Sequence, residues 1–152
     1  MKRTSFAEMQ CSVARTLEVV GEWWTMLIIR EAFNGVRRFD AFQDKLGIAR
    51  NVLSDRLRKL VDAGVLERRQ YTEHPPRYEY RLTEKGLDLY PVLVSLLQWG
   101  DRWVAGEMGP PVVLRHRGCG HDMHASLSCD ECGASVGPRD VEARPGPGVR
   151  AR

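Results

Sequence analysis

The sequence predicts a mainly α-helical protein with a small β-hairpin wing, a winged helix-turn-helix, followed by a small zinc-ribbon-like appendage. Three observations support this prediction. Amphipathic helical patterns, a glycine turn and an alternating hairpin follow one another between residues 12 and 82. Basic residues are concentrated in the second half of that stretch. Cysteine and histidine residues gather late in the chain, beyond a Gly-Pro-Pro boundary.

Two helices are predicted in the first 33 residues. The first spans residues 12–21 and ends at Gly21, because apolar residues recur in it at helical spacing. The second spans residues 22–33, and its Trp23-Trp24 pair is expected to face the core rather than to bind a cofactor. Val13, Leu17 and Val20 give the first helix its helical spacing, and Trp23, Met26, Leu27 and Phe33 are predicted to face mostly inward in the second.

A helix-turn-helix is predicted next. A short helix over residues 39–46 is followed by the break Gly47-Ile48-Ala49. A longer helix over residues 50–63 ends at Gly64, which suits a left-handed C-cap. Such a turn lets two helices cross steeply, so that the second can enter a DNA major groove about 12 Å wide.

A hairpin and a long helix complete the predicted domain. Residues 65–71 and 78–82 read as two strands, joined by a loop that contains two prolines. Thr83 is expected to cap a helix that runs to about Val104 and bends at Pro91.

The boundaries divide the chain into three predicted parts. Residues 1–108 form a DNA-binding and dimerisation domain with the winged helix-turn-helix fold. Residues 109–138 form the zinc-ribbon-like appendage, and residues 139–152 are a Pro/Gly/Arg-rich tail that we expect to be disordered.

The composition is that of a cytoplasmic globular protein. The chain has 152 residues, of which 43% are hydrophobic and 28% charged. It contains no apolar run near the roughly 20 residues that a membrane span needs. The basic start, residues 1–6, is not followed by the apolar core of a signal peptide. We therefore expect a cytoplasmic location and no membrane partner.

The basic residues are unevenly distributed. The whole chain has a net charge of only +3, but residues 34–81 hold eleven cations and seven anions. A localised positive surface is what a protein that tracks phosphates needs, because Lys and Arg replace the condensed counterions of DNA. A solvated charged face is the alternative interpretation of the charge pattern alone.

The helix over residues 50–63 is the predicted reading element. At 100° per residue, one side is apolar and holds the helix to the domain, with Leu53, Leu57, Leu60 and Val61. The other side is polar, with Asn51, Ser54, Asp55, Arg58 and Asp62.

Four residues of this helix are candidates for base contacts. They are Arg50, Asn51, Ser54 and Arg58, since Arg and Asn can make paired hydrogen bonds to guanine and adenine edges. Arg56 lies between the two sides, where it can bind either a phosphate or an internal carboxylate.

The wing and the neighbouring loops supply the remaining DNA-binding candidates. Two prolines stiffen the wing tip, so that Arg77 can reach a flanking groove or phosphate at little entropic cost. Arg37, Arg38 and Lys45 are expected near the phosphate backbone as contacts that carry no sequence information. A module of the same fold that binds proteins rather than specific DNA is the alternative.

Several segments together resemble one known family. Gly21-Glu22-Trp23-Trp24-Thr25 and Leu27-Ile28-Ile29-Arg30-Glu31 are similar to a stretch of the HxlR-type regulators, which are relatives of the MarR group. Arg37-Arg38-Phe39-Asp40, Gly47-Ile48-Ala49, Val52-Leu53-Ser54 and Leu60-Val61 extend the likeness. Pro76-Arg77-Tyr78-Glu79-Tyr80 and the following Leu82-Thr83 resemble that family's wing and the start of its last long helix. The likeness covers roughly residues 10–105.

The resemblance implies a homodimer that acts at a palindromic operator, usually as a repressor. The residues support dimerisation independently, because the helix from Thr83 is apolar on more than one face. A domain of this size has little else to cover such a helix, and a partner subunit would present two reading helices to half-sites about one DNA turn apart. A buried core helix of a monomer is the alternative.

Cys11 matches the place where several family members carry a cysteine that senses oxidants or electrophiles. Ser12 replaces the proline that often follows this cysteine in the family. The resemblance makes Cys11 a redox-sensing candidate, and a thiol near a helix start can be acidified by the helix. The alternative is a small apolar residue packed at the dimer interface. A small-molecule effector is also compatible with the family.

The late cysteines have the spacing of zinc ligands. His116-x-x-Cys119 and Cys129-x-x-Cys132 are two matching pairs, each followed by glycine. Four such ligands give the closed tetrahedral shell of structural Zn²⁺, and His121 or His124 competes with His116 for the fourth place. A degenerate ribbon without zinc is the alternative.

An enzymatic role is not predicted. The cysteine cluster has no open coordination position with a neighbouring base, and the sequence contains no triad-like or phosphate-cradling glycine motif.

Overall fold

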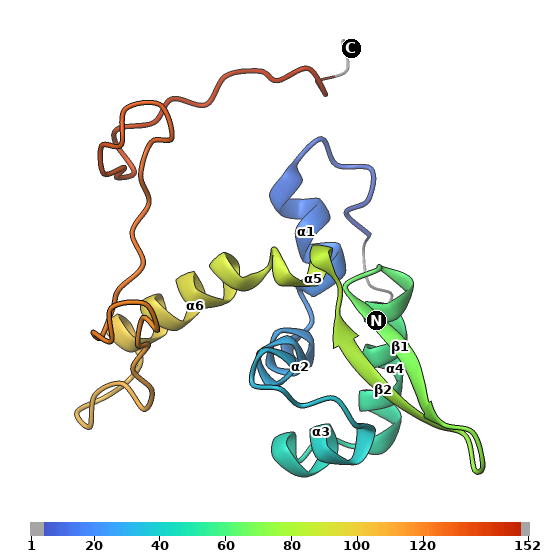
Figure 1. The fold of residues 1–152 in the computed structure, drawn as a ribbon. Helices are drawn as coiled ribbons and strands as arrows, with labels where there is room; N and C mark the ends of the chain where they lie inside the picture. Colours follow the sequence, from blue (N-terminus) through green and yellow to red (C-terminus); the bar gives the residue numbers. More distant parts are fainter. Residues whose placement is uncertain (1–4, 150–152) are drawn as a thin grey trace. The chain divides into compact units, whose positions relative to one another are not determined.

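The structure is a computed structural model that describes residues 5–149 (Figure 1). The chain forms two compact units that divide between Leu93 and Val94. The elements follow in the order α1 (Ser12–Val20), α2 (Trp23–Phe33), α3 (Phe39–Leu46), α4 (Arg50–Asp62), β1 (Leu66–Thr72), β2 (Arg77–Leu82), α5 (Glu84–Leu87) and α6 (Tyr90–Trp103). In the described part of the chain, no helix is both long and apolar enough to cross a membrane.

The helix-turn-helix forms where the sequence predicts it. α3 ends at Gly47, whose φ of 61° is left-handed and reverses the chain toward α4. α4 begins at Arg50 and ends at Asp62, and Gly64 has a φ of 70°. Glycine adopts such angles without the steric cost that a Cβ atom brings.

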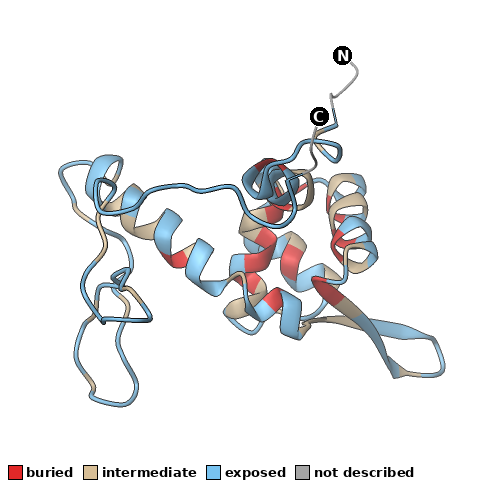
Figure 2. Ribbon diagram, turned by 90° about the horizontal axis from the view of Figure 1, so that it is seen from above, coloured by how far each residue is buried: buried red, intermediate tan, exposed pale blue. Residues whose placement is uncertain are grey.

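The core of the first unit is built by α2, α3 and α4. Ile28 and Ile29 of α2, Phe42 of α3, and Leu53 and Leu57 of α4 are fully buried. Figure 2 shows buried residues in these helices and at the base of the wing, with a few more in α1 and α6, whereas the wing is exposed toward its tip. The α4 side that the sequence predicts to be apolar is therefore the side that packs.

The wing is a two-stranded antiparallel hairpin fixed to the helices at its base. β1 pairs with β2, with Leu66 opposite Leu82 and Arg68 opposite Tyr80. The Tyr80 N–H donates to the Arg37 carbonyl oxygen at 2.7 Å, so the segment before α3 is held against β2. The hairpin extends beyond the helices to a turn at residues 73–76 (Figure 1).

Two local predictions are wrong. The helix expected from Thr83 to Val104 is interrupted between α5 and α6, although Thr83 caps α5 as predicted, with its Oγ1 accepting from the Gly86 N–H at 3.1 Å. Pro91 is therefore the second residue of a new helix, in the first turn that tolerates proline, rather than at a bend within one helix.

The predicted inward orientation of Trp23 is the second error. Trp23 is 91% exposed, because α2 turns the opposite side, with Thr25, Ile28 and Ile29, toward the core. Trp24 is half-buried and packs against the core as expected. In α1, Val20 is buried but Val13 and Leu17 are exposed on this single chain.

The second unit consists of most of α6 and an extended segment. Residues 104–149 contain no helix, and no residue among them is buried. Isolated bridges pair Arg115 with Asp122 and Ser128 with Ser135, so two small hairpin-like turns form around the cysteines. Residues 139–149 have no regular structure, and the end of the predicted disordered tail lies outside the described residues.

Candidate nucleic-acid interface

The polar side of α4 faces solvent at the helix-turn-helix. Arg50, Asn51, Ser54 and Arg58, the four candidates for base contacts, are all exposed. They share this side because Leu53, Leu57 and Leu60 take the opposite side into the core. The predicted reading face is therefore available to an outside partner.

Arg50 lies at the N-terminal end of this face. Its guanidinium lies over the Phe39 ring, 4.9 Å from the ring centroid, and its Nη1 is 3.9 Å from Asp40 Oδ1. Both partners belong to α3, so the Arg50 side chain reaches across the turn to the neighbouring helix. The Arg50 side chain remains 75% exposed.

Asp55 joins three basic residues of α4. Its carboxylate accepts from Arg56 Nη1 and Arg58 Nη2, each at 2.6 Å, and lies 3.0 Å from Lys59 Nζ. The hydrogen bond from Lys59, followed by that from Arg58, lowers the pKa of Asp55 below its ordinary value. Asp55 is not among the predicted site residues, although the i, i+3 and i, i+4 spacings of Arg58 and Lys59 from it are the sequence signal for such a cluster.

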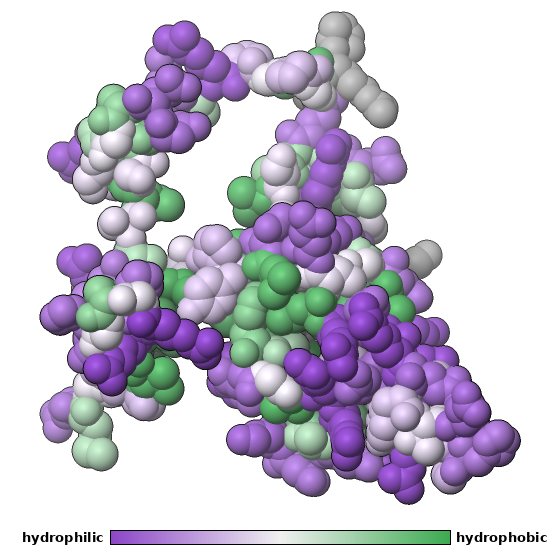
Figure 3. All heavy atoms as spheres, in the orientation of Figure 1, coloured by the Kyte–Doolittle hydropathy of each residue, from purple (hydrophilic) through white to green (hydrophobic). Residues whose placement is uncertain are grey.

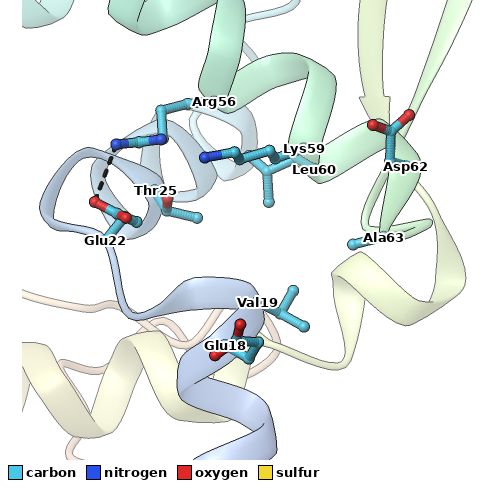
Figure 4. A pocket seen from close by; sticks show the side chains of 9 residues that line it. All are labelled: Glu18, Val19, Glu22, Thr25, Arg56, Lys59, Leu60, Asp62 and Ala63. Atoms are coloured by element: carbon cyan, nitrogen blue, oxygen red, sulfur yellow. Dashed lines mark hydrogen bonds and ion pairs between the residues drawn. The ribbon is translucent and has the colours of Figure 1, made fainter. Parts of the chain in front are cut away.

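Arg56 points into the protein and not toward the reading face. Its Nη2 donates to Glu22 Oε2 at 3.0 Å across the space between α4 and α2, as Figure 4 shows. The Arg56 side chain is only 16% exposed, and its Nε is buried without a partner among the described residues. Of the two roles left open for Arg56, the structure shows the internal carboxylate.

A cavity of about 320 Å³ lies beside this ion pair (Figure 4). Its lining comes from α1, α2 and α4 and includes Glu18, Thr25 and Lys59. Charged and apolar side chains line it together, so we regard it as a gap between packed helices.

The wing adds cationic and aromatic side chains next to α4. Arg77 is exposed at the start of β2, and the Arg68 guanidinium lies 4.1 Å from the centroid of the Tyr78 ring. The Arg38 guanidinium lies 4.7 Å from the centroid of the Tyr71 ring. Stacking of this kind orients a guanidinium while leaving its N–H groups free to donate.

The predicted backbone anchors lie on the same unit. Arg37, Arg38 and Lys45 are exposed, the first two just before α3 and the third in its last turn. In Figure 3 hydrophilic surface covers the α4 and wing side of this unit, whereas hydrophobic surface gathers at the centre of the face shown. The structure thus brings the predicted DNA-binding residues, except Arg56, to exposed positions around α3, α4 and the wing.

Cys11 lies at the other end of the first unit. It is the N-cap residue of α1, is exposed, and has a free thiol. Along the chain, the whole of α1, α2 and α3 lies between Cys11 and the α4 reading face.

The predicted zinc ligands form two separate pairs. His116 Nδ1 is 3.3 Å from Cys119 Sγ. Hydrogen bonds from the backbone N–H groups of Cys132 and Glu131 lower the pKa of the Cys129 thiol. Within residues 5–149, no group of three or more His, Cys, Asp or Glu side chains is close enough to hold a metal ion. The zinc-ribbon prediction therefore stays a prediction.

Several known proteins are similar to this chain in sequence and in structure. The sequence profile of the HxlR-like helix-turn-helix family matches residues 19–108. The HTH-type transcriptional regulator Rv3095 of Mycobacterium tuberculosis is 50% identical over 141 residues, which are 93% of this chain and 89% of the relative.

Two solved structures are similar as well. The crystal structure of PA1607, provisionally described as a transcription factor, superposes with a TM-score of 0.85 at 38% identity, and covers 94% of this chain and all of that one. The redox regulator HypR in its reduced form has a TM-score of 0.58 at 32% identity, with 60% of this chain and 92% of HypR covered.

We predict that Arg56 and Arg58 have separable roles. Arg56→Ala removes the hydrogen bonds to Glu22 and Asp55 at a half-buried site, and should lower the free energy of unfolding by about 1–3 kcal/mol. Arg58→Ala is the matched control: Arg58 is 69% exposed, and its loss should change stability by no more than about 0.5 kcal/mol. Urea unfolding of both variants measures the difference. Equal stabilities would contradict the role of Arg56 as an anchor between α2 and α4.

Proposed function

The chain belongs to the HxlR-like helix-turn-helix family of transcriptional regulators, and we propose that it binds DNA sequence-specifically as a homodimeric repressor at a palindromic operator. The observation that supports this proposal most strongly is the exposed polar side of α4, which presents Arg50, Asn51, Ser54 and Arg58. Side chains of these types can read base edges in a major groove.

The ion pair between Arg58 and Asp55 does not prevent a base contact. An exposed pair of this kind contributes about 0–1 kcal/mol. A bidentate arginine–guanine contact discriminates by about 1–3 kcal/mol. Arg58 can therefore leave Asp55 for a guanine at a net gain, whereas on unrelated sequences Asp55 still holds it. Asp55 in this proposal disfavours non-specific binding.

The basic residues outside α4 would hold the phosphate backbone. Arg37, Arg38 and Lys45 lie before and within α3, and Arg77 lies on the wing. Contacts of this type set the position of the protein on the duplex and make the affinity depend steeply on salt.

The homodimer in this proposal is formed through α6. Val92, Leu96, Trp99 and Trp103, which we call the α6 stripe, recur at helical spacing and are 40–65% exposed. Covering a large apolar side chain contributes roughly 1.5–3 kcal/mol, so four of them favour a partner surface of the same kind. A two-fold dimer would present two copies of α4 to a palindrome.

We also propose that Cys11 makes the regulator responsive to oxidants. The exposed thiol at the start of α1 is accessible to reagents, and the structural relative HypR is named a redox regulator. Oxidation would join Cys11 to the same residue of the partner subunit, or to a small thiol, in a disulfide. A disulfide at α1 would alter how two subunits are held.

The test of DNA reading is selection of bound duplexes from a random pool, followed by titrations of the selected site. Arg58→Ala and Arg77→Ala should each weaken binding by about 1–3 kcal/mol where a base contact is lost. Arg144→Ala is the matched control, because it removes the same charge from an 81%-exposed residue of the C-terminal segment and should leave the affinity unchanged. A reporter promoter that carries the site should be less active when the protein is present.

The alternative function makes the opposite prediction. A winged-helix module that binds proteins would enrich no sequence from the pool and would be indifferent to Arg58→Ala. Enrichment of a single half-site rather than a palindrome would contradict the homodimeric arrangement while leaving DNA reading intact.

The dimer prediction can be checked by sedimentation velocity. The wild-type chain should sediment as a dimer. Trp99→Glu should shift it toward monomer, because the dimer interface would have to bury a carboxylate that has no opposite charge to pair with. Val141→Glu places the same charge at a 64%-exposed residue outside the stripe and should leave the dimer intact. A wild-type chain that is monomeric at tens of micromolar would contradict this part of the proposal.

For the redox proposal, operator binding is compared with and without the thiol oxidant diamide. Wild type should lose affinity with diamide and regain it with a reductant, and Cys11→Ser should not respond. Non-reducing electrophoresis should show the intersubunit disulfide in wild type and not in Cys11→Ser. A full response in Cys11→Ser would refute the assignment.

A further inference from the structure

The two turns around the late cysteines have the same backbone hydrogen bonds. In the first, the His116 N–H donates to the His121 carbonyl at 2.9 Å, and the Gly120 N–H donates to the His116 carbonyl at 2.8 Å. In the second, thirteen residues later, the Cys129 N–H donates to Ala134 at 2.9 Å and the Gly133 N–H donates to Cys129 at 2.8 Å. We call these turns knuckle 1 (residues 114–123) and knuckle 2 (residues 127–136).

The likeness extends to the ends of both knuckles. The Met123 N–H donates to the Leu114 carbonyl in knuckle 1, as the Val136 N–H donates to the Leu127 carbonyl in knuckle 2. Gly120 and Gly133 take left-handed φ angles of 73° and 71° at the same position. The two knuckles therefore repeat one backbone conformation, although their sequences share few residues.

This repeat places the ligand-type side chains at equivalent positions. His116 corresponds to Cys129, and Cys119 corresponds to Cys132. We propose that Zn²⁺ binds His116, Cys119, Cys129 and Cys132 and draws the two knuckles into one closed site. When zinc binds, the three thiols release their protons to solvent and ligate the ion as thiolates. With a neutral His116, the occupied site has a net charge of −1.

The geometry of knuckle 1 already fits half of such a site. Zinc bonds of about 2.3 Å to sulfur and about 2.0–2.1 Å to nitrogen, at tetrahedral angles, separate the two ligand atoms by about 3.6 Å. His116 Nδ1 and Cys119 Sγ are 3.3 Å apart. Only a small change is needed for both atoms to ligate one ion.

The structure also distinguishes among the three histidines. The His116 ring lies over Gly118 inside knuckle 1, where a Cβ atom on Gly118 would be 2.9 Å from His116 Cε1. His121 corresponds to Ala134 in knuckle 2, a position without a ligand. His124 lines a cavity of about 450 Å³ next to α6 residues such as Leu97 and Asp101. His116 is therefore the histidine that we assign to the metal.

A metal would supply what this segment lacks. Residues 104–149 include no buried residue, so no apolar core holds the two knuckles together. Three residues, 124–126, connect the knuckles, and Gln98 of α6 holds that connection through hydrogen bonds to Ala125 N and O at 2.7 and 3.0 Å. Small segments without a core commonly derive their stability from a metal ion.

The test is the zinc content of the full-length chain after dialysis against submicromolar free zinc. Wild type should hold about one zinc ion per chain, and Cys129→Ser and His116→Ala should each lose most of it. Cys11→Ser, His121→Ala and His124→Ala are the matched controls and should keep it. Circular dichroism should show unchanged helix content in every variant, because the helices lie outside the knuckles.

Cobalt(II) provides a second readout that does not depend on metal retention. Added to the metal-free chain, it should give the visible absorption of tetrahedral cobalt with thiolate ligands in wild type and in His124→Ala, but not in His116→Ala. A wild-type chain without zinc, or zinc retained in Cys129→Ser, would overturn the proposal. Loss of zinc from His124→Ala but not from His116→Ala would overturn the choice of histidine. None of these outcomes depends on operator binding.

Discussion

Burial of one side of α4 is the constraint on which the rest of the first unit depends. Leu53, Leu57 and Leu60 are fully or almost fully buried against α2, α3 and the base of the wing. A helix can rotate only as a unit, so the packing of these three leucines also fixes which side chains face outward. The exposed positions of Asn51, Ser54 and Arg58 are consequences of the core, and a sequence that loses the leucines would lose the reading face with them.

The charges of α4 are divided by burial into two classes. Arg56 and Arg58 are two residues apart, yet one is 16% and the other 69% exposed, because they lie on opposite sides of the helix. Asp55 contacts both, so a single carboxylate stabilises the inner arginine and restrains the outer one. Hydrogen bonds from Lys59 and Arg58 hold the pKa of Asp55 below its ordinary value, so Asp55 stays ionised and keeps its contacts with both arginines throughout the neutral range.

Local signals allowed most of the fold to be predicted, and tertiary contacts explain the failures. Gly47 and Thr83 act within one turn of the chain, and α3 and the α5 cap begin or end where the sequence places them. The break before α6 and the exposure of Trp23 depend on what packs against each helix, which periodicity does not encode. Periodicity predicts the reading face, but it leaves the role of Arg56 open because Arg56 lies on the border between the two sides of α4. The side chains of the two knuckles differ, so their common backbone conformation is visible only in the structure.

The two cysteine proposals constrain each other. The chain has four cysteines, and a closed zinc site would hold three of them as thiolates bound to metal. Cys11 would then be the one thiol left for an oxidant, so a disulfide could form only with a partner subunit or a small thiol. Without zinc, Cys119 and Cys132 are exposed thiols as well, and an oxidant would have several targets. By occupying the other three thiols, zinc would thus confine the oxidant response to Cys11 at the start of α1. The metal content therefore has to be controlled in any redox experiment on this chain.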